Sequence, residues 1–439
     1  MPRPNILYLH SHDTGRYIQP YGHAVATPNL QRLAEQGMLF RQAFCAGPTC
    51  SPSRAALLTG QWPHSSGMIG LAHRGFVLND PTQLLPHAPR RAGYYTALVG
   101  VQHVAAGAGL DLLGYDFVER ARASDRVADV APQAIAFLRN APRQPFFLDC
   151  GFHETHREYP PHGPEDDPRH CLPPAPLPDT PETRADMACF HASARELDRG
   201  VGLVLEALEA SGLAGDTLVI CTTDHGIAFP FMKCNLTDHG MGVLLILRGP
   251  GGFSGGQVSE ALVSHVDLFP TLCEFLGIAP PPWLQGVSIL PLLRKEKAEI
   301  REELFGEVTY HAAYEPQRAV RTRRWKYIRR FAPRPTPVLP NIDDSPSKSV
   351  LLAHGLRERP VEAEQLYDLL FDPGESCNCV GDPRAAVALA EMRRRLERYM
   401  HSTADPLLRG PVPAPEGAQV NDPAGLSPRE PTRLTNSFS

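Results

Sequence analysis

Short, continuous apolar runs alternate along this 439-residue chain with stretches of helical periodicity. The runs are too short for helices and contain few polar residues, which is typical of strands buried on both faces. Such strands occur in parallel sheets covered by helices on both sides, so the alternation predicts an α/β fold. The expected strands span residues 5–9, 96–100, 145–150, 217–222 and 243–247.

Three stretches between these runs carry the signals of helices. Residues 28–37 begin with proline and end with glycine, and residues 53–60 also end with glycine. Residues 182–212 place leucines and valines on one face at helical spacing. The sequence therefore predicts a long helix there and two shorter ones nearer the N-terminus.

The character of the sequence changes near residue 300. Residues 319–330 partly alternate apolar and basic side chains, which favours an antiparallel strand, and residues 385–400 favour a helix. Residues 332–348 are rich in proline and are expected to form a loop. We expect three parts: a catalytic α/β domain over 1–300, an α+β subdomain over 301–401, and a Pro/Gly-rich tail over 402–439.

The composition argues against several kinds of partner. The formal net charge is −5, which gives no electrostatic footprint for nucleic acid. No run reaches the 18 or so apolar residues of a membrane span, and the apolar run at 6–9 is too short for a signal peptide. The ten cysteines are scattered and form no CxxC pair, so we expect reduced thiols. We expect a cytoplasmic protein with no nucleic-acid or membrane partner.

Polar, chemically versatile residues follow two of the expected strands. His12 and Asp13 come after the first, and Asp224 and His225 come directly after residues 217–222. The carboxyl ends of parallel strands meet at the edge of the sheet where α/β proteins bind ligands. Either pair alone could simply hydrogen-bond the local backbone. Together the two pairs favour a metal site.

Cys50 stands just before an expected helix, where backbone N–H groups favour an anion. Arg54 follows one helical turn later and can reach the same anion. A lone cysteine is usually an inert core residue, but this one has an arginine and a helix start beside it. Residues 50–54 are therefore a candidate catalytic segment.

The segment 50–60, with the pattern C-x-P-S-R-x-x-L-L-T-G, resembles the signature of the type I sulfatases. Further similar segments are RPNIL at 3–7, TPNLQRLAEQG at 27–37, DHG at 224–226 and LYDLLFDPGE at 366–375. The resemblance covers most of the chain. It is nearest to the heparan N-sulfatase-like branch, through FHETH at 152–156 and DHGIAFPFMK at 224–233.

This resemblance implies an alkaline-phosphatase-like fold: a central, mostly parallel sheet with helices on both faces, and a small C-terminal antiparallel subdomain. It implies that a maturation enzyme converts Cys50 into formylglycine, whose hydrate is the nucleophile. It also implies one divalent metal ion, usually calcium. The positions that match metal ligands are His12, Asp13, Cys50, Asp224 and His225.

The resemblance also implies roles for the remaining candidates. Arg54 matches the arginine that stabilises the formylglycine, and His103 matches a histidine that acts on its hydroxyl group. His156 and Lys233 match residues that bind the sulfate and assist the leaving group. His153 and Lys233 are expected to contact the substrate.

Two positions depart from the family pattern. His12 stands where an aspartate is usual, and Val101 stands where a lysine is usual, two positions before His103. The first change replaces a carboxylate with an imidazole, which favours zinc, manganese or iron over calcium where His12 points into the site. The alternative is that His12 turns away and leaves a three-residue site that retains calcium. The second removes a positive charge from the sulfate pocket.

We therefore expect a metal-dependent sulfatase that hydrolyses a sulfate ester or a sulfamate of a small molecule or saccharide. One alternative is a phosphodiester or phosphonate monoester hydrolase on the same fold, because a similar site can stabilise a phosphoryl transition state. Another is a non-catalytic relative that binds an anion or a metal, an idea motivated by Val101.

Overall fold

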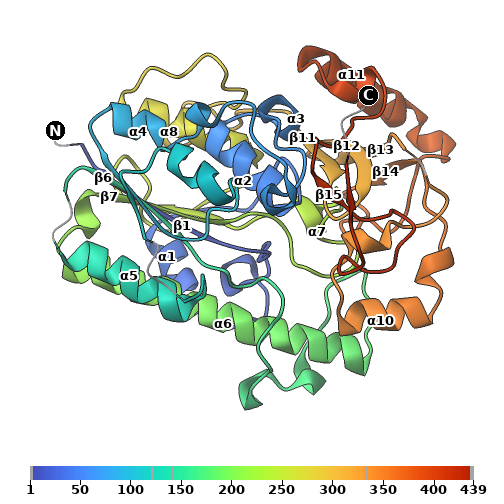
Figure 1. Cartoon of the computed structure of the whole chain (residues 1–439), viewed down its shortest axis with the longest axis horizontal. Coiled ribbons are helices and arrows are strands. Elements are labelled where there is room, and N and C mark those ends of the chain that lie inside the picture. Colours follow the sequence, from blue (N-terminus) through green and yellow to red (C-terminus); the bar gives the residue numbers. More distant parts are fainter. Residues whose placement is uncertain (1–2, 120–122, 141–142, 333, 436–439) are drawn as a thin grey trace.

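The computed structural model describes residues 3–119, 123–140, 143–332 and 334–435. Its centre is an eight-stranded sheet in the order β5-β4-β6-β1-β7-β8-β2-β9 (Figure 1). The predicted α/β fold is confirmed. The strands are β1 Asn5–Ser11, β2 Met38–Phe40, β4 Tyr95–Gly100, β5 Phe117–Val118, β6 Phe146–Gly151, β7 Thr217–Thr223, β8 Leu245–Arg248 and β9 Gln257–Ser259. A small parallel pair joins β3 Ala43–Phe44 to β10 Val263–Ser264.

Strand β1 lies in the middle of the sheet and pairs in parallel with both β6 and β7. The prediction that 243–247 forms a parallel strand was wrong in direction, because β8 runs antiparallel to β7 and to β2. Its continuous apolar run reflects burial on both faces, which an interior antiparallel strand shares with a parallel one.

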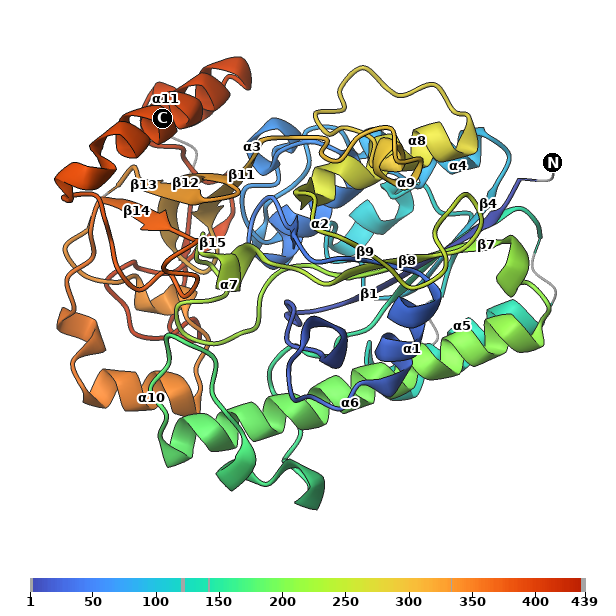
Figure 2. The same ribbon diagram turned by 180° about the vertical axis from the view of Figure 1, so that it is seen from behind.

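Helices cover both faces of this sheet (Figures 1 and 2). One face carries α1 Pro28–Gln36, α5 Val127–Arg139 and α6 Pro181–Ala210. The other carries α2 Cys50–Thr59, α4 His87–Arg91 and α8 Leu268–Leu276. Helix α6 confirms the long helix expected over 182–212, and the Thr180 side chain caps its N-terminus by accepting a hydrogen bond from the Thr183 N–H group. Shorter helices are α3 Pro63–Ser66, α7 Asp238–Met241 and α9 Leu290–Leu293.

The alternation of side chains along β1 builds the two apolar layers. Ile6 and Tyr8 belong to the cluster under α2 and α8, whereas Leu7 and Leu9 belong to the cluster under α1, α5 and α6. With both faces buried, the strand is fixed in register. Its carboxyl end therefore delivers the polar residues that follow Leu9 to one defined edge of the sheet.

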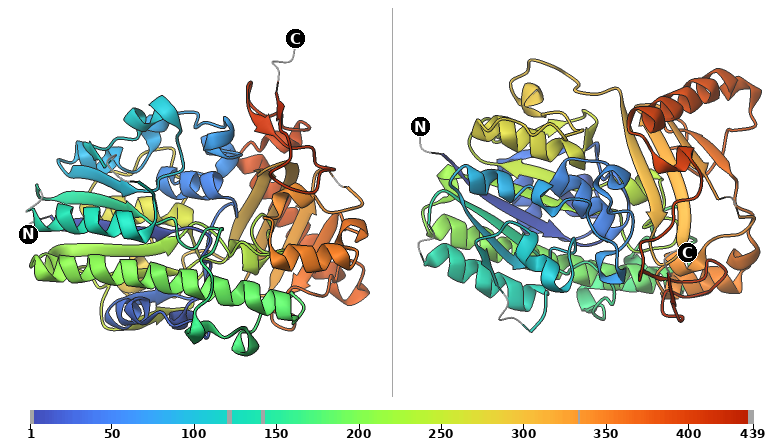
Figure 3. Two further views of the ribbon diagram at one scale, coloured as in Figure 1. Left: turned by 60° about the horizontal axis from the view of Figure 1, so that its bottom comes forward. Right: turned by 45° about the horizontal axis from the view of Figure 1, so that its top comes forward.

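A smaller antiparallel sheet lies at one end of the molecule, coloured orange to red in Figure 3. It consists of β11 Glu303–Tyr310, β12 Tyr314–Thr322, β13 Trp325–Arg330 and β14 Glu364–Asp368, with α10 Pro346–Ala353 and α11 Ala386–Ser402 beside it. Residues 319–330 were expected to form one strand, but they hold the end of β12, a turn and all of β13. Helix α10 starts inside the expected proline-rich loop.

The segment after α11 returns to the N-terminal half of the chain. It contributes the short pair β15 Gln419–Val420 and β16 Arg433–Leu434, and Arg74 donates a hydrogen bond of 2.7 Å to Asn421 Oδ1. The ends of the expected domains at 1–2 and 436–439 lie outside the described residues. Within the described ranges, none of the helices combines the length and apolar character that crossing a bilayer requires.

A buried cluster of charges joins the two halves. Arg318 Nε on β12 lies 2.5 Å from Asp405 Oδ2 and 3.1 Å from Glu307 Oε2, and its side chain is fully buried. His64 on α3 reaches the same carboxylate, with Nδ1 2.6 Å from Glu307 Oε2. Burial by itself would lower the pKa of His64, but Glu307 raises it above its usual value. The guanidinium and the imidazole together balance two buried carboxylates.

Replacing Arg318 with methionine should destabilise the protein strongly, because Glu307 and Asp405 would stay buried with one cationic partner fewer. We expect a loss of about 3–5 kcal/mol in the free energy of unfolding, measured by urea denaturation. The control is Arg323→Met, since Arg323 pairs with Glu299 while both side chains remain exposed. That change should cost less than about 1 kcal/mol. Equal losses in the two variants would contradict this account of the interface.

Candidate active site

The two expected metal-binding pairs meet at the carboxyl edge of the sheet. Ser11, the last residue of β1, lies in register with Thr223, the last residue of β7. Asp13 has a φ of 51°, so the chain has left the extended conformation and both His12 and Asp13 can face the same site. The Asp13 N–H group donates a hydrogen bond of 2.8 Å to Asp224 Oδ1. This bond joins the segments that follow β1 and β7.

Four buried side chains at this edge can share one metal ion. His12, Asp13, Cys50 and Asp224 each offer a ligand atom, and these atoms lie within 4.8 Å of one another. His225 adds Nε2, which lies 3.3 Å from Asp13 Oδ1. Both of those last atoms are buried without a hydrogen-bond partner in the described residues. Facing ligand atoms left without a partner are what a cation site requires, so these residues fit the divalent metal expected from the sequence.

The charge of Asp224 is strongly stabilised. Burial alone would raise its pKa, but His225, Arg54 and His12 lower it well below the usual value. His12 Nδ1 lies 3.1 Å from Asp224 Oδ2, so His12 points into the site. Burial and the charge of Arg54 lower the pKa of His12 well below its usual value, which keeps the imidazole neutral at pH 7. The site therefore offers a carboxylate and a neutral imidazole side by side.

The Arg54 side chain is only 3% exposed, and its guanidinium group contacts three polar partners. Its Nη2 donates to Asp224 Oδ2 at 3.2 Å and to the Ser11 carbonyl oxygen at 2.9 Å. Its Nη1 lies 2.6 Å from His10 Nδ1. Helix α2, which begins at Cys50, is thereby fixed against β1 and β7.

His10, one of the partners of Arg54, is itself positioned by Asp149. His10 Nε2 lies 2.8 Å from Asp149 Oδ1, and the Tyr115 hydroxyl donates to Asp149 Oδ2 at 2.5 Å. No role was predicted for these positioning residues. Asp149 lies inside strand β6, where an isolated polar residue gives no motif, and only the pairing of β1 with β6 brings it near His10.

Lys233 provides a buried positive charge on the other side of the metal-binding group. Its Nζ lies 3.0 Å from Asp13 Oδ2 and 3.1 Å from Asp343 Oδ2. Burial would lower the pKa of Lys233, but the two carboxylates raise it well above its usual value. Asp343 belongs to the proline-rich segment of the C-terminal subdomain, and no sequence pattern pointed to it. The smaller subdomain thus contributes a side chain to the site.

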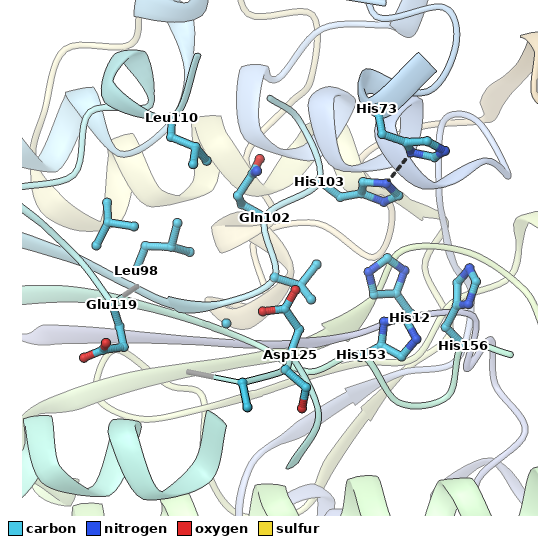
Figure 4. A pocket seen from close by; sticks show the side chains of 15 residues that line it. His12, His73, Leu98, Gln102, His103, Leu110, Glu119, Asp125, His153 and His156 are labelled. Carbon is cyan, nitrogen blue, oxygen red and sulfur yellow. Dashed lines mark hydrogen bonds between the residues drawn. The ribbon is translucent and has the colours of Figure 1, made fainter. Parts of the chain in front are cut away.

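Histidines form one wall of a cavity of about 660 Å³ beside this group (Figure 4). The His12 ring centroid lies 5.5 Å from that of His103 and 5.5 Å from that of His156, and the His153 and His156 rings are 4.9 Å apart. His73, which the sequence analysis did not single out, places Nδ1 3.0 Å from His103 Nε2. Burial lowers the pKa of His103 well below its usual value, and burial with His156 lowers that of His153 to about 4.

The structure brings all the candidates together at this edge of the sheet. His156 Nε2 lies 4.0 Å from Asp13 Oδ2, so it faces the metal-binding group. Val101 lines the same cavity as an uncharged side chain. The individual chemical roles remain predictions. The residues assembled are His12, Asp13, Cys50, Arg54, His103, His153, His156, Asp224, His225 and Lys233.

Comparison with known proteins identifies this arrangement. The sulfatase family model matches residues 4–278. The chain belongs to the sulfatase family. A second model, the C-terminal region of N-sulphoglucosamine sulphohydrolase, matches residues 225–347. The chain is therefore a sulfatase, as the sequence resemblance implied, and the phosphodiester or phosphonate alternative is not favoured.

Individual relatives agree over nearly the whole chain. Human N-sulphoglucosamine sulphohydrolase is 32% identical, over 93% of this chain and 92% of that protein. An ulvan-active sulfatase of Formosa agariphila is 29% identical, over 92% of this chain and 76% of its own length.

Solved structures share the fold. A 2-O GAG sulfatase superposes with a TM-score of 0.71 at 22% identity, covering 94% of this chain and 95% of its own. A protein in complex with its substrate D-glucosamine-2-N,6-O-disulfate gives a TM-score of 0.73 at 19% identity, covering 93% and 99% of the two chains. The mostly parallel central sheet and the C-terminal antiparallel sheet are therefore those of sulfatases.

If His103 and His156 handle protons, their alanine variants should lower kcat by about 10²–10⁴-fold. Neither residue belongs to an apolar cluster, so the unfolding temperature should change little. His23→Ala is a suitable control, because His23 lies in a separate cavity. A variant that loses thermal stability but keeps its kcat would show that the replaced histidine is structural.

Proposed function

We propose that this sulfatase removes sulfate from an amino sugar, as a sulfamate or a sulfate ester, through a formylglycine made from Cys50. The observation that carries the proposal is the match of residues 225–347 to the C-terminal region of N-sulphoglucosamine sulphohydrolase. That segment supplies His225, Lys233 and Asp343, which meet at the site. The similarity therefore covers residues that can contact a substrate as well as the scaffold.

Membership of the sulfatase family implies, in general, a formylglycine nucleophile and a bound metal ion. A formylglycine hydrate at position 50 would supply the hydroxyl nucleophile, and a divalent cation held beside it would supply positive charge for the sulfate oxygens. Asp13, Asp224 and His225 would hold the cation, with His12 and residue 50 completing its surroundings. The maturation enzyme that makes formylglycine is then a required partner.

The remaining residues neutralise charge and move protons. Arg54 is fixed beside position 50, and Lys233 is fixed beside Asp13, so two cationic groups flank the place where a sulfate would lie. His156 faces that place from the cavity wall and would donate a proton to the leaving oxygen or nitrogen. His103, oriented by His73, would accept the hydroxyl proton at position 50 when sulfate is released.

Substrate screening with the matured, metal-loaded enzyme tests the substrate class. We expect glucosamine N-sulfate and glucosamine 6-O-sulfate to be hydrolysed with higher kcat/KM than 4-nitrophenyl sulfate. 4-Nitrophenyl phosphate should be the poorest of the four. Faster turnover of the phosphate would contradict the proposal, and binding of sulfated sugars without turnover would support a non-catalytic role.

Mass spectrometry of the tryptic peptide Gln42 to Arg54 should show an aldehyde at Cys50 in active protein from the native host. Cys45 lies in the same peptide and is also buried, but no proline and arginine follow it at the motif spacing, so it serves as the internal control. Cys50→Ser should lose the aldehyde and most of the activity. Active protein with an intact Cys50 thiol would refute the formylglycine proposal.

We propose that the metal is manganese or zinc, because His12 points into the site in place of a carboxylate. The apo-enzyme should then regain activity with manganese or zinc more fully than with calcium. His12→Asp should shift the bound metal toward calcium, as measured by elemental analysis, and His12→Ala should reduce metal content. Restoration by calcium alone, with the metal content of His12→Ala unchanged, would show that His12 does not select the metal.

We also propose a cytoplasmic location. All ten cysteines are free in the structure, which suits a reducing compartment. Cell fractionation with an antibody against the native protein tests this, and recovery in an extracytoplasmic fraction would contradict it.

A further inference from the structure

The metal-binding edge contains a second, overlapping set of ligands. Cys50, His12 and His103 offer a sulfur and two imidazole nitrogens that all lie within 4.8 Å of one another. Cys50 and His12 are buried and His103 is half-buried. This set shares two residues with the carboxylate-containing set, but it replaces Asp13 and Asp224 with His103.

The contacts around the two imidazoles match those of metal-bound histidines. Such histidines hold the metal with one ring nitrogen while the other contacts a carboxylate or another polar group. His12 Nδ1 lies 3.1 Å from Asp224 Oδ2 and is buried with no hydrogen-bond partner in the described residues. His103 Nε2 lies 3.0 Å from His73 Nδ1, and His103 Nδ1 is buried with no hydrogen-bond partner in the described part of the chain.

The chemistry of the set differs from that of the carboxylate site. One thiolate and two neutral imidazoles form a soft, nitrogen- and sulfur-rich set, which selects zinc over calcium and magnesium. Three protein ligands also leave a fourth position open for water, as in many zinc sites. This set exists only while residue 50 is still a cysteine, and His12 stands where the family usually has an aspartate.

We propose that the chain binds zinc through Cys50, His12 and His103 before Cys50 is oxidised. In this step the S–H bond of Cys50 breaks, an S–Zn bond forms and the proton leaves to solvent, so nothing is oxidised or reduced. The inference rests on the proposed function only in taking Cys50 as the site of maturation.

Cobalt(II) is the spectroscopic probe for this site. Full-length protein with Cys50 shown to be a thiol by mass spectrometry is freed of metal with a chelator and titrated with cobalt. We expect a thiolate-to-cobalt charge-transfer band in the near ultraviolet that saturates at one equivalent and disappears when zinc is added.

Three variants assign the ligands. Cys50→Ser should abolish the band, and His103→Ala should weaken cobalt binding by at least about tenfold. Cys45→Ser is the matched control, because Cys45 is a buried cysteine close in sequence that lies outside the ligand set, and it should keep the full band. If His103→Ala does not fold by circular dichroism, His103→Gln takes its place.

Three results would overturn the proposal. They are the absence of the band in folded wild-type precursor, its persistence in Cys50→Ser, and unchanged cobalt affinity in the His103 variant, which would place the metal in the carboxylate set. Aldehyde formation and turnover of sulfated sugars are measured on separate, matured protein. Failure of the precursor site is therefore distinguishable from failure of the proposed function.

Discussion

The buried guanidinium of Arg54 is the interaction on which the rest of the site depends. It joins helix α2 to the ends of β1 and β7 through Ser11, Asp224 and His10. A buried charge that loses its partners costs several kcal/mol, so α2 cannot move relative to the sheet without a large penalty. Because Cys50 is the first residue of α2, the same contacts fix its position against Asp224.

The smaller subdomain contributes Asp343 to the site, so the position of Lys233 depends on how the two halves pack. Asp343 shares Lys233 with Asp13, so the position of this lysine depends on a carboxylate from each half. The contact between His64 and Glu307, in the buried Arg318 cluster, joins the same halves at another place.

Sequence reasoning recovered what local patterns encode. The apolar runs located the central strands, and the polar residues after β1 and β7 located the metal-binding edge. It could not recover features set by distant pairing. The direction of β8 depends on its neighbours rather than on its own apolar run. Asp149 and Asp343 reach the site from elements far away in sequence, and His73 matters only because the 3-10 helix Ala72–Arg74 places it against His103.

The two departures from the family pattern are linked by charge. His12 and Val101 line the same cavity, so both changes act on one region. Replacing an aspartate with histidine removes a negative charge, since burial keeps His12 neutral, and replacing a lysine with valine removes a positive charge. The net charge of the region is then the same as in the usual pattern, and the region has fewer buried charges to compensate. What changes is the kind of ligand atom that position 12 offers to a cation, an imidazole nitrogen in place of a carboxylate oxygen.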